Sequence, residues 1–275
     1  MEVRDHLLRK IAVQSTRALE DLSLVALALR QVPPQLRAAQ VACGAWPPYS
    51  DQGPPSAFHT ALALLAMRRA GYTIDDRTDR AFRWLDSVKG IESHWFWRWK
   101  FRLADRSVSF DPLKSGWPWF EGTISWVAPT AMAILAYRAH GRQSSRLDSA
   151  VDMLLNRASP LGGWNAGNSV VMGVPLGAHA DFTAMALLAL GPMENQPQIS
   201  KALDYLSAHA ESLSSAYSLA WALMALAAHR PKSVARLRER LCSRLSSPEG
   251  FPVRTLALSA LALEVPVFDW SISTQ

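Results

Sequence analysis

Asp181 stands two residues before Thr183, at the start of one of the most apolar stretches of the chain. A carboxyl group can serve as a general acid when burial keeps it protonated at neutral pH. An aspartate at a helix start is also a preferred N-cap, where backbone N–H groups hold it ionised. His179, two residues earlier, could hydrogen-bond the carboxyl group. The residues therefore predict either a proton donor supported by His179 or a helix cap.

The chain is rich in tryptophan, and several of its aromatic residues could line a cavity. The chain has 11 tryptophans against 5 tyrosines, which is typical of an aromatic-lined cavity or a wet interface, although large rings also fill cores. A ring face stabilises a cation by about 0.5–2 kcal/mol. The rings that we expect to line a substrate cavity lie within or beside apolar helices: Trp117, Trp119, Trp126, Trp164, Phe182 and Trp221.

A third candidate lies at residues 95–102, where WFWRWKFR alternates aromatic and basic side chains from Trp97 onward. In an extended segment this pattern would place the rings on one side and the cations on the other. Rings with basic neighbours suit a membrane interface. The segment predicts either a peripheral membrane contact through Trp95–Arg102 or a loop packed over the fold with its cations in solvent.

Metal chemistry is not expected. The letters Asp75-Asp76-Arg77-Thr78-Asp79 have the spacing of a carboxylate site for Mg²⁺. They also open an amphipathic stretch, and aspartates at a helix start explain them without a metal. Cys43 and Cys242 form no metal-type pair. We therefore predict neither a metal ion nor a cofactor.

The elements that would position these residues are repeats. A Ser or Thr followed by a run of Ala, Leu and Met occurs six times, from Ser23, Thr60, Thr130, Thr183, Ser218 and Thr255. Each phrase is apolar around its whole circumference, which predicts a buried helix opened by the Ser or Thr. Amphipathic helices are expected between them at residues 75–89, 144–158, 197–210 and 231–245, the last two opened by proline.

Six buried helices alternating with exposed ones predict an all-α, closed double ring, an (α/α)6 toroid. A straight solenoid would need polar capping repeats, and neither terminal phrase is polar. Nothing in the chain marks a break, so we expect one domain over residues 1–275 with an insertion at about 90–122.

Glycine next to an aromatic residue recurs in the connections, at Gly44-Ala45-Trp46, Gly116-Trp117, Gly162-Gly163-Trp164 and Gly250-Phe251. Glycine permits a tight turn after an outer helix, and the ring then fills the space between successive helix pairs. Together with the apolar phrases, these turns resemble the repeats of squalene–hopene cyclases, oxidosqualene cyclases and protein prenyltransferase β subunits. The resemblance spans residues 20 to 264 and looks closest to short, single-domain bacterial relatives of the cyclases.

The resemblance implies an isoprenoid or another apolar small molecule as ligand. Class II terpene cyclases protonate an alkene or epoxide with the central Asp of an Asp-x-Asp-Asp-Thr-Ala motif. When Thr183-Ala184 is laid on its Thr-Ala, Asp181 takes the donor position, while His179 and Phe182 replace the flanking aspartates. Prenyltransferases would supply Asp, Cys and His to Zn²⁺. No apolar phrase here contains cysteine, so that activity is not expected.

The composition limits the classes of partner and the cellular location that we expect. The net charge is +6, but no block of Lys and Arg is long enough to predict nucleic-acid binding. The first residues lack the apolar stretch of a signal peptide, and no run approaches a membrane span. Two distant cysteines are typical of a reducing compartment. We therefore expect a cytoplasmic protein, or one peripheral to the inner face of the membrane.

Two functions fit the sequence. One is a class II terpene cyclase, an isomerase or lyase with Asp181 as general acid and the aromatic rings as cation stabilisers. The other is a non-catalytic toroid that binds an isoprenoid, another lipid or a protein. A third possibility is different chemistry in the same cavity. Because known class II cyclases commonly add a second ring, a protein partner could complete the site.

Overall fold

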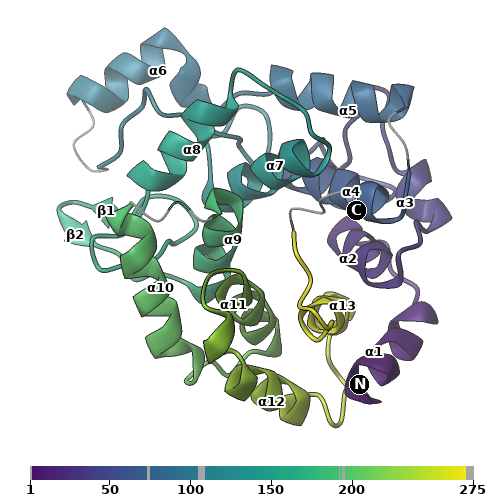
Figure 1. Cartoon of the computed structure of the whole chain (residues 1–275). Helices are drawn as coiled ribbons and strands as arrows, with labels where there is room; N and C mark the ends of the chain where they lie inside the picture. Colours follow the sequence, from purple (N-terminus) through teal and green to yellow (C-terminus); the bar gives the residue numbers. More distant parts are fainter. Residues whose placement is uncertain (1, 73–74, 105–108, 192, 194–195, 271–275) are drawn as a thin grey trace.

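Six helices form a closed inner ring in the computed structural model, which describes residues 2–72, 75–104, 109–191, 193 and 196–270. Neighbours in the ring follow chain order, and the last helix packs against the first. Figure 1 looks into this ring. The inner helices are α2 (Leu19–Leu29), α4 (Ala57–Arg69), α7 (Val127–Ala139), α9 (Ala180–Leu190), α11 (Ala216–His229) and α13 (Val253–Ala262).

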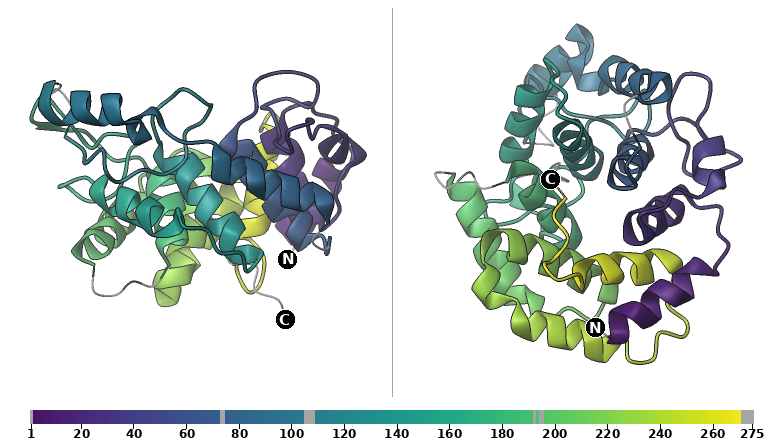
Figure 2. Two further views of the ribbon diagram at one scale, coloured as in Figure 1. Left: turned by 90° about the horizontal axis from the view of Figure 1, so that it is seen from above. Right: turned by 45° about the vertical axis from the view of Figure 1, so that its right-hand side comes forward.

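A second layer of helices surrounds the ring (Figures 1 and 2). Each outer helix packs against an inner one, with α1 against α13 and α10 against α9. The outer helices are α1 (Glu2–Ala12), α3 (Pro34–Ala38), α5 (Asp76–Ser87), α8 (Leu147–Asn156), α10 (Pro197–Ala210) and α12 (Ala235–Arg244). The predicted double ring of buried and exposed helices is therefore confirmed.

The inner helices are buried because they are apolar on every side. In α9, every residue from Thr183 to Leu190 is buried. Their alanines let neighbouring backbones approach closely. The outer helices have one apolar face, and α5 begins as the sequence predicts, with the Asp75 side chain accepting a hydrogen bond from the Thr78 N–H at 2.9 Å. The aspartates at this position therefore cap and begin a helix.

The starts of the inner helices differ from the prediction. Thr60, Thr130 and Thr183 are the fourth residues of their helices, because α4, α7 and α9 begin three residues earlier. Ser23 is likewise inside α2, which starts at Leu19. The hydroxyl groups do not open the helices. The hydroxyl groups of Thr60, Thr130 and Thr183 instead bind the turn that enters each helix.

This turn is a repeated structural unit with a tryptophan at its centre. The backbone N–H of the tryptophan donates to a threonine Oγ1 at 2.9 Å in three copies: Trp46 to Thr60, Trp117 to Thr130 and Trp164 to Thr183. The indole N–H donates to the last turn of the preceding outer helix, at the carbonyls of Leu36, Leu85 and Leu154. Each tryptophan thus links an outer helix to the next inner helix, as the glycine–aromatic pattern predicted.

The glycine before the tryptophan is needed for this close approach. A Cβ atom on Gly116 would lie 2.3 Å from Thr130 Oγ1, and one on Gly163 would lie 2.6 Å from Thr183 Oγ1. Gly163 also has a φ of +77°, which favours glycine. A side chain at this position would therefore clash with the threonine hydroxyl, so the turn requires glycine here.

The remaining elements are short. The 3₁₀ helices η1 (Ile91–Ser93) and η3 (Pro231–Ser233) lie in connections, and strands β1 (Val170–Val171) and β2 (Val174–Pro175) form an antiparallel hairpin. The aromatic segment of the insertion is helical, with α6 (Trp95–Trp99) followed by the π-helix η2 (Lys100–Ala104). The extended conformation considered for residues 95–102 is therefore wrong. Within the described residues, no helix has the length and apolar character needed to cross a membrane.

The C-terminal ends of the inner helices meet at the other opening of the ring, where basic side chains cover their carbonyl groups. Arg69 Nε donates to Leu27 O of α2 at 2.8 Å, and Arg68 Nε donates to Ala139 O of α7 at 2.9 Å. Arg138 donates in the same way to Ala189 O of α9. Cations at helix C-termini are favourable because the last carbonyls carry partial negative charge.

Candidate functional site

The N-terminal ends of the inner helices meet at one opening of the ring, which we call the N-terminal mouth. Their first turns carry several polar side chains: Glu20 and Asp21 on α2, His59 on α4, Asp181 on α9, Tyr217 on α11 and Arg254 on α13. Acids, a phenol, an imidazole and a guanidinium therefore converge on the same end of the fold as the turn tryptophans.

Glu20 and Tyr217 are joined across this mouth. The Tyr217 hydroxyl donates to Glu20 Oε1 at 2.9 Å, and the two residues come from α2 and α11, the helices on either side of α13. Burial raises the pKa of Glu20, and the Tyr217 hydrogen bond and the charge of Arg254 offset this only in part. Glu20 thus holds a proton more readily than an exposed glutamate does.

The neighbouring Asp21 is buried more deeply. Thr16 Oγ1 donates to Asp21 Oδ2 at 2.9 Å, whereas Asp21 Oδ1 is buried with no hydrogen-bond partner in the described part of the chain. The charge of Asp21 also raises the pKa of Glu20. Two adjacent carboxyl groups at one helix start therefore favour a proton on one of them.

Asp181 is the second residue of α9 and is partly buried. The N-cap is His179, so the cap interpretation of Asp181 is wrong, although a first-turn acid is still favoured by the helix dipole. His179 is exposed, and no hydrogen bond joins it to Asp181 among the described residues. Burial raises the pKa of Tyr205 and of Tyr217, and the charge of Asp181 adds to the rise in both. Asp181 therefore acts electrostatically on the tyrosine of the Glu20–Tyr217 pair.

The six predicted aromatic residues divide into two groups. Trp117 and Trp164 are fully buried in the turns described above, and Trp221 is 1% exposed. These three rings therefore present almost no surface to a ligand. Trp119, Trp126 and Phe182 are partly buried at the N-terminal mouth. Trp119 packs against Phe58, with ring centroids 4.7 Å apart, so this second group is the one placed to face a substrate.

His59 lies beside the same aromatic cluster. Its ring centroid is 6.3 Å from that of Trp119, and its Nδ1 is 2.9 Å from Ser56 Oγ. Burial lowers the pKa of His59 to about 4, so the imidazole is neutral at pH 7. A neutral imidazole at the mouth could accept a proton in a reaction.

Glu20, Tyr217 and His59 were not predicted as site residues from the sequence. With the first inner helix expected to start at Ser23, Glu20 fell outside it. With the start at Leu19, Glu20 is the second residue of α2, the position that Asp181 holds in α9 and Tyr217 holds in α11. The signal that could have found Glu20 is therefore the acid in the first turn, counted from the helix start.

The opposite end of the ring is entered by the chain itself. The segment that follows α13 runs into the middle of the ring in both figures. Trp270 is fully buried there and stacks on Trp221, with centroids 4.8 Å apart and ring planes at 22°. Phe268 is also buried, and the guanidinium of Arg69 lies 4.1 Å from its ring centroid.

The aromatic segment of the insertion presents part of its surface to solvent. Trp95, Phe96 and Trp99 are 73%, 45% and 55% exposed. Trp97 is partly buried and stacks on Phe101, with centroids 5.8 Å apart. In this helical conformation Trp95 and Trp99 face the solvent, whereas Trp97 packs against Phe101. The rings therefore do not all lie on one side, as the extended alternation would have placed them.

Comparison with known proteins places the fold. No protein-family model matches the chain, and no curated protein matches it by sequence. Among solved structures, the type II terpene cyclase MstE from Scytonema is similar, with 13% sequence identity and a TM-score of 0.57, covering 88% of this chain and 80% of that one. A variant of MstE in complex with merosterolic acid A, its product, covers 92% and 80% at 16% identity, with a TM-score of 0.55. The chain thus has the α/α toroid fold seen in a type II terpene cyclase.

Proposed function

We propose that this chain is an isoprenoid cyclase that begins its reaction by protonating the substrate at the N-terminal mouth, with Glu20 as the general acid. The observation that carries the proposal is the partly buried Glu20 carboxyl group, whose pKa is raised and which accepts a hydrogen bond from Tyr217. The likeness of the fold to a type II terpene cyclase supports the same reaction class.

The reaction follows from these groups. Glu20 transfers its proton to a terminal alkene or epoxide of a polyprenyl chain, which leaves a carboxylate on Glu20 and a carbocation on the substrate. The Tyr217 hydroxyl stabilises that carboxylate by hydrogen bonding. Trp119, Trp126 and Phe182 then stabilise the cation with their ring faces while further double bonds attack it and close rings. Loss of a proton from the final cation to a base ends the sequence as a net isomerisation.

Asp181 is the alternative acid, and the resemblance to the cyclase motif favours it. Its position in the first turn of α9 is equivalent to that of Glu20 in α2. A proton donor must remain protonated until it reacts, and burial is the cause that achieves this. Because burial raises the pKa of Glu20, we assign the reacting proton to Glu20.

The test is turnover of polyprenyl substrates by matched variants. The protein is incubated in D₂O with farnesol, geranylgeraniol, squalene or their terminal epoxides, and the products are analysed by mass spectrometry. We expect a cyclic product with one deuterium at the protonated carbon, lost in Glu20→Gln and retained in Asp181→Asn. Glutamine can still accept the Tyr217 hydrogen bond, so the melting temperature should change little. Loss of product only in Asp181→Asn would assign the acid to Asp181.

A second candidate function is a toroid without catalysis, which binds an isoprenoid or a protein partner. The buried Trp270 favours this candidate, because a ring from the chain's own C-terminal segment occupies the interior beside Trp221. Absence of product from every polyprenyl substrate with the wild-type protein, together with an isoprenoid that remains bound in native mass spectrometry, would support binding in place of cyclisation.

We also propose that α6 contacts an anionic membrane surface. Trp95, Phe96 and Trp99 supply exposed rings, while Lys100 and Arg102 follow in η2. Rings with basic neighbours favour the interface of anionic lipids. Co-sedimentation with phosphatidylglycerol liposomes should fall several-fold in Trp95→Ala/Trp99→Ala. The control is Trp97→Ala, whose ring packs against Phe101. No sedimentation of the wild type would overturn the proposal.

A further inference from the structure

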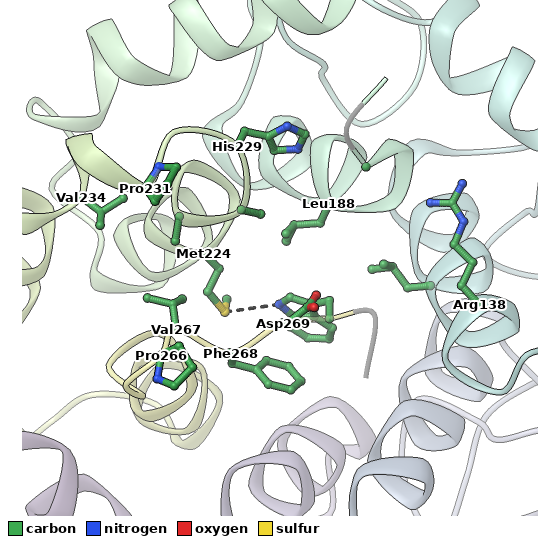
Figure 3. Close-up of a pocket in the computed structure, with 15 residues that line it drawn as sticks. Arg138, Leu188, Met224, His229, Pro231, Val234, Pro266, Val267, Phe268 and Asp269 are labelled. Carbon is green, nitrogen blue, oxygen red and sulfur yellow. Dashed lines mark hydrogen bonds between the residues drawn. The ribbon is translucent and has the colours of Figure 1, made fainter. Parts of the chain in front are cut away.

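A cavity of about 540 Å³ lies at the C-terminal end of the inner ring, opposite the N-terminal mouth. Its walls come from the last turns of α7, α9 and α11 and from the segment that follows α13 (Figure 3). Most of the lining is apolar, with Leu188, Met224, Phe268 and Trp270 among its residues. A volume in the range of about 300–1,000 Å³ suits a small organic ligand.

Arg138 is the basic group on one side of this cavity. Its guanidinium donates one hydrogen bond, to Ala189 O at the end of α9, and no carboxylate pairs with it among the described residues. Burial lowers the pKa of Arg138, but an arginine remains charged at neutral pH. Arg138 as a whole residue is exposed to solvent, so its guanidinium is open to an anion that enters the cavity beside it.

Three other polar groups line the cavity, from His229, Trp270 and Asp269, and none of them makes a hydrogen bond or ion pair with Arg138 in the described part of the chain. His229 Nε2 is 3.1 Å from Leu187 O, so this nitrogen carries the hydrogen and donates it to the carbonyl. Burial lowers the pKa of His229, which keeps its ring neutral. Trp270 donates its indole N–H to Met224 Sδ at 3.3 Å, as the dashed line in Figure 3 marks. Asp269 also lines the cavity, is exposed and has an interaction of its own.

We propose that this cavity binds a single-chain amphiphile with a carboxylate head group, the head group on Arg138 and the apolar chain over Leu188, Met224 and Trp270. The guanidinium can donate two parallel hydrogen bonds to a carboxylate, a geometry that a neutral or cationic head group does not offer. A fatty acid and an isoprenoid acid share this chemistry. The site is independent of the proposed cyclisation, because it lies at the opposite end of the ring from Glu20.

Arg68 provides a matched control for Arg138. Arg68 Nε caps Ala139 O at the end of α7, just as Arg138 caps Ala189 O at the end of α9. Arg68 does not line the cavity. A substitution at either residue therefore removes a helix-capping cation, and only the substitution at Arg138 removes the proposed carboxylate contact.

The experiment is isothermal titration calorimetry of the whole protein with dodecanoate and dodecyltrimethylammonium below their critical micelle concentrations and dodecanol below its solubility limit. We expect dodecanoate to bind about tenfold or more tightly than the other two. Arg138→Gln should lose that preference, Arg138→Lys should keep part of it, and Arg68→Gln should keep it in full. Farnesoic acid in place of dodecanoate distinguishes an isoprenoid chain from a fatty acyl chain.

Three results would overturn the proposal. Equal affinity for the three head groups would show that Arg138 does not select the anion. Unchanged dodecanoate binding in Arg138→Gln would place the ligand elsewhere, and an equal loss in Arg68→Gln would show a general effect of helix capping. If Arg138→Gln does not fold, the comparison of head groups on the wild-type protein still decides the question.

Discussion

The indole ring of Trp270 lies parallel to that of Trp221 inside the helical ring, with 4.8 Å between their centroids. Trp221 belongs to the inner helix α11, whereas Trp270 comes from the segment after the last helix. A tryptophan expected to face a substrate is therefore covered by the chain's own C-terminal segment. The C-terminal segment fills the interior of the toroid from one end, whereas Trp119, Trp126 and Phe182 at the N-terminal mouth remain partly exposed.

Removal of this C-terminal ring should destabilise the fold. We expect Trp270→Ala to lower the free energy of unfolding by about 3–5 kcal/mol, because it removes the stack on Trp221 and leaves a cavity. Trp270→Phe should recover part of that loss. Val265→Ala serves as the control, since Val265 is 86% exposed. Urea denaturation measures the three values, and a loss in Trp270→Ala no larger than that of the control would show that the C-terminal segment is not packed in the ring.

The turn unit gives a second prediction. Thr183 Oγ1 accepts the buried N–H of Trp164, and valine has nearly the same shape without the hydroxyl. Thr183→Val should therefore cost about 1–3 kcal/mol, because the N–H loses its acceptor away from water. Thr130→Val should cost about the same, since it breaks the same contact at Trp117. Denaturation of Ser212→Ala, at an exposed hydroxyl, gives the baseline, and a matching change there would contradict the assignment.

The sequence could predict the ring because the information is local and repeated. An all-apolar phrase has no polar face to expose, so it must be buried, and six such phrases with amphipathic helices between them can close into two layers. The tryptophan turns were also predictable, because glycine beside an aromatic recurs before the apolar phrases. Their hydrogen bonds to threonine were not, since they depend on how far each helix extends before its threonine.

The candidate site was less predictable because it depends on contacts between distant helices. Glu20 and Tyr217 are 197 residues apart, and only closure of the ring brings them to 2.9 Å. Asp181 could be found from a local motif, but neither its first-turn position nor its distance from His179 could. The entry of Trp270 into the ring was equally hidden, because a terminal segment carries no periodic pattern that states where it packs.

His59 gives the protein a defined response to acid. Its pKa is about 4 in the fold and about 6.5 in an unfolded chain. Between these values the unfolded state takes up a proton that the folded state does not, so stability from neutral His59 is present above pH 6.5 and is lost as the pH falls toward 4. At pH 5 the loss from this one group is about 2 kcal/mol.

Urea denaturation of the wild type and of His59→Gln at pH 7 and pH 5 tests this effect. The decrease in unfolding free energy between the two values should be smaller in the variant by about 2 kcal/mol. Between pH 7 and pH 8 the imidazole stays neutral in both states, so the two proteins should respond alike. An identical decrease in both proteins from pH 7 to pH 5 would mean that His59 accepts a proton in the folded state.

Substitution of Glu264 should destabilise the ring, because its carboxylate binds arginines of α1 and α4 beside the end of α13. Arg69, at the end of α4, donates to both carboxylate oxygens at 2.6 and 2.7 Å, and Arg4 of α1 donates to Oε1 at 2.9 Å. The Glu264 and Arg69 side chains are only 12% and 10% exposed, so the ion pair is poorly screened. Glu264→Gln leaves the arginine charges without their carboxylate in a partly dry site. We expect a loss of about 3–5 kcal/mol in unfolding free energy.

Asp51→Asn is the control variant. It removes an exposed pair with Arg17 at 2.9 Å and should cost less than about 1 kcal/mol in unfolding free energy. Equal values for the two variants, measured by chemical denaturation at the same ionic strength, would show that the closure of the ring rests on apolar packing of α13 against α2 and α1 alone.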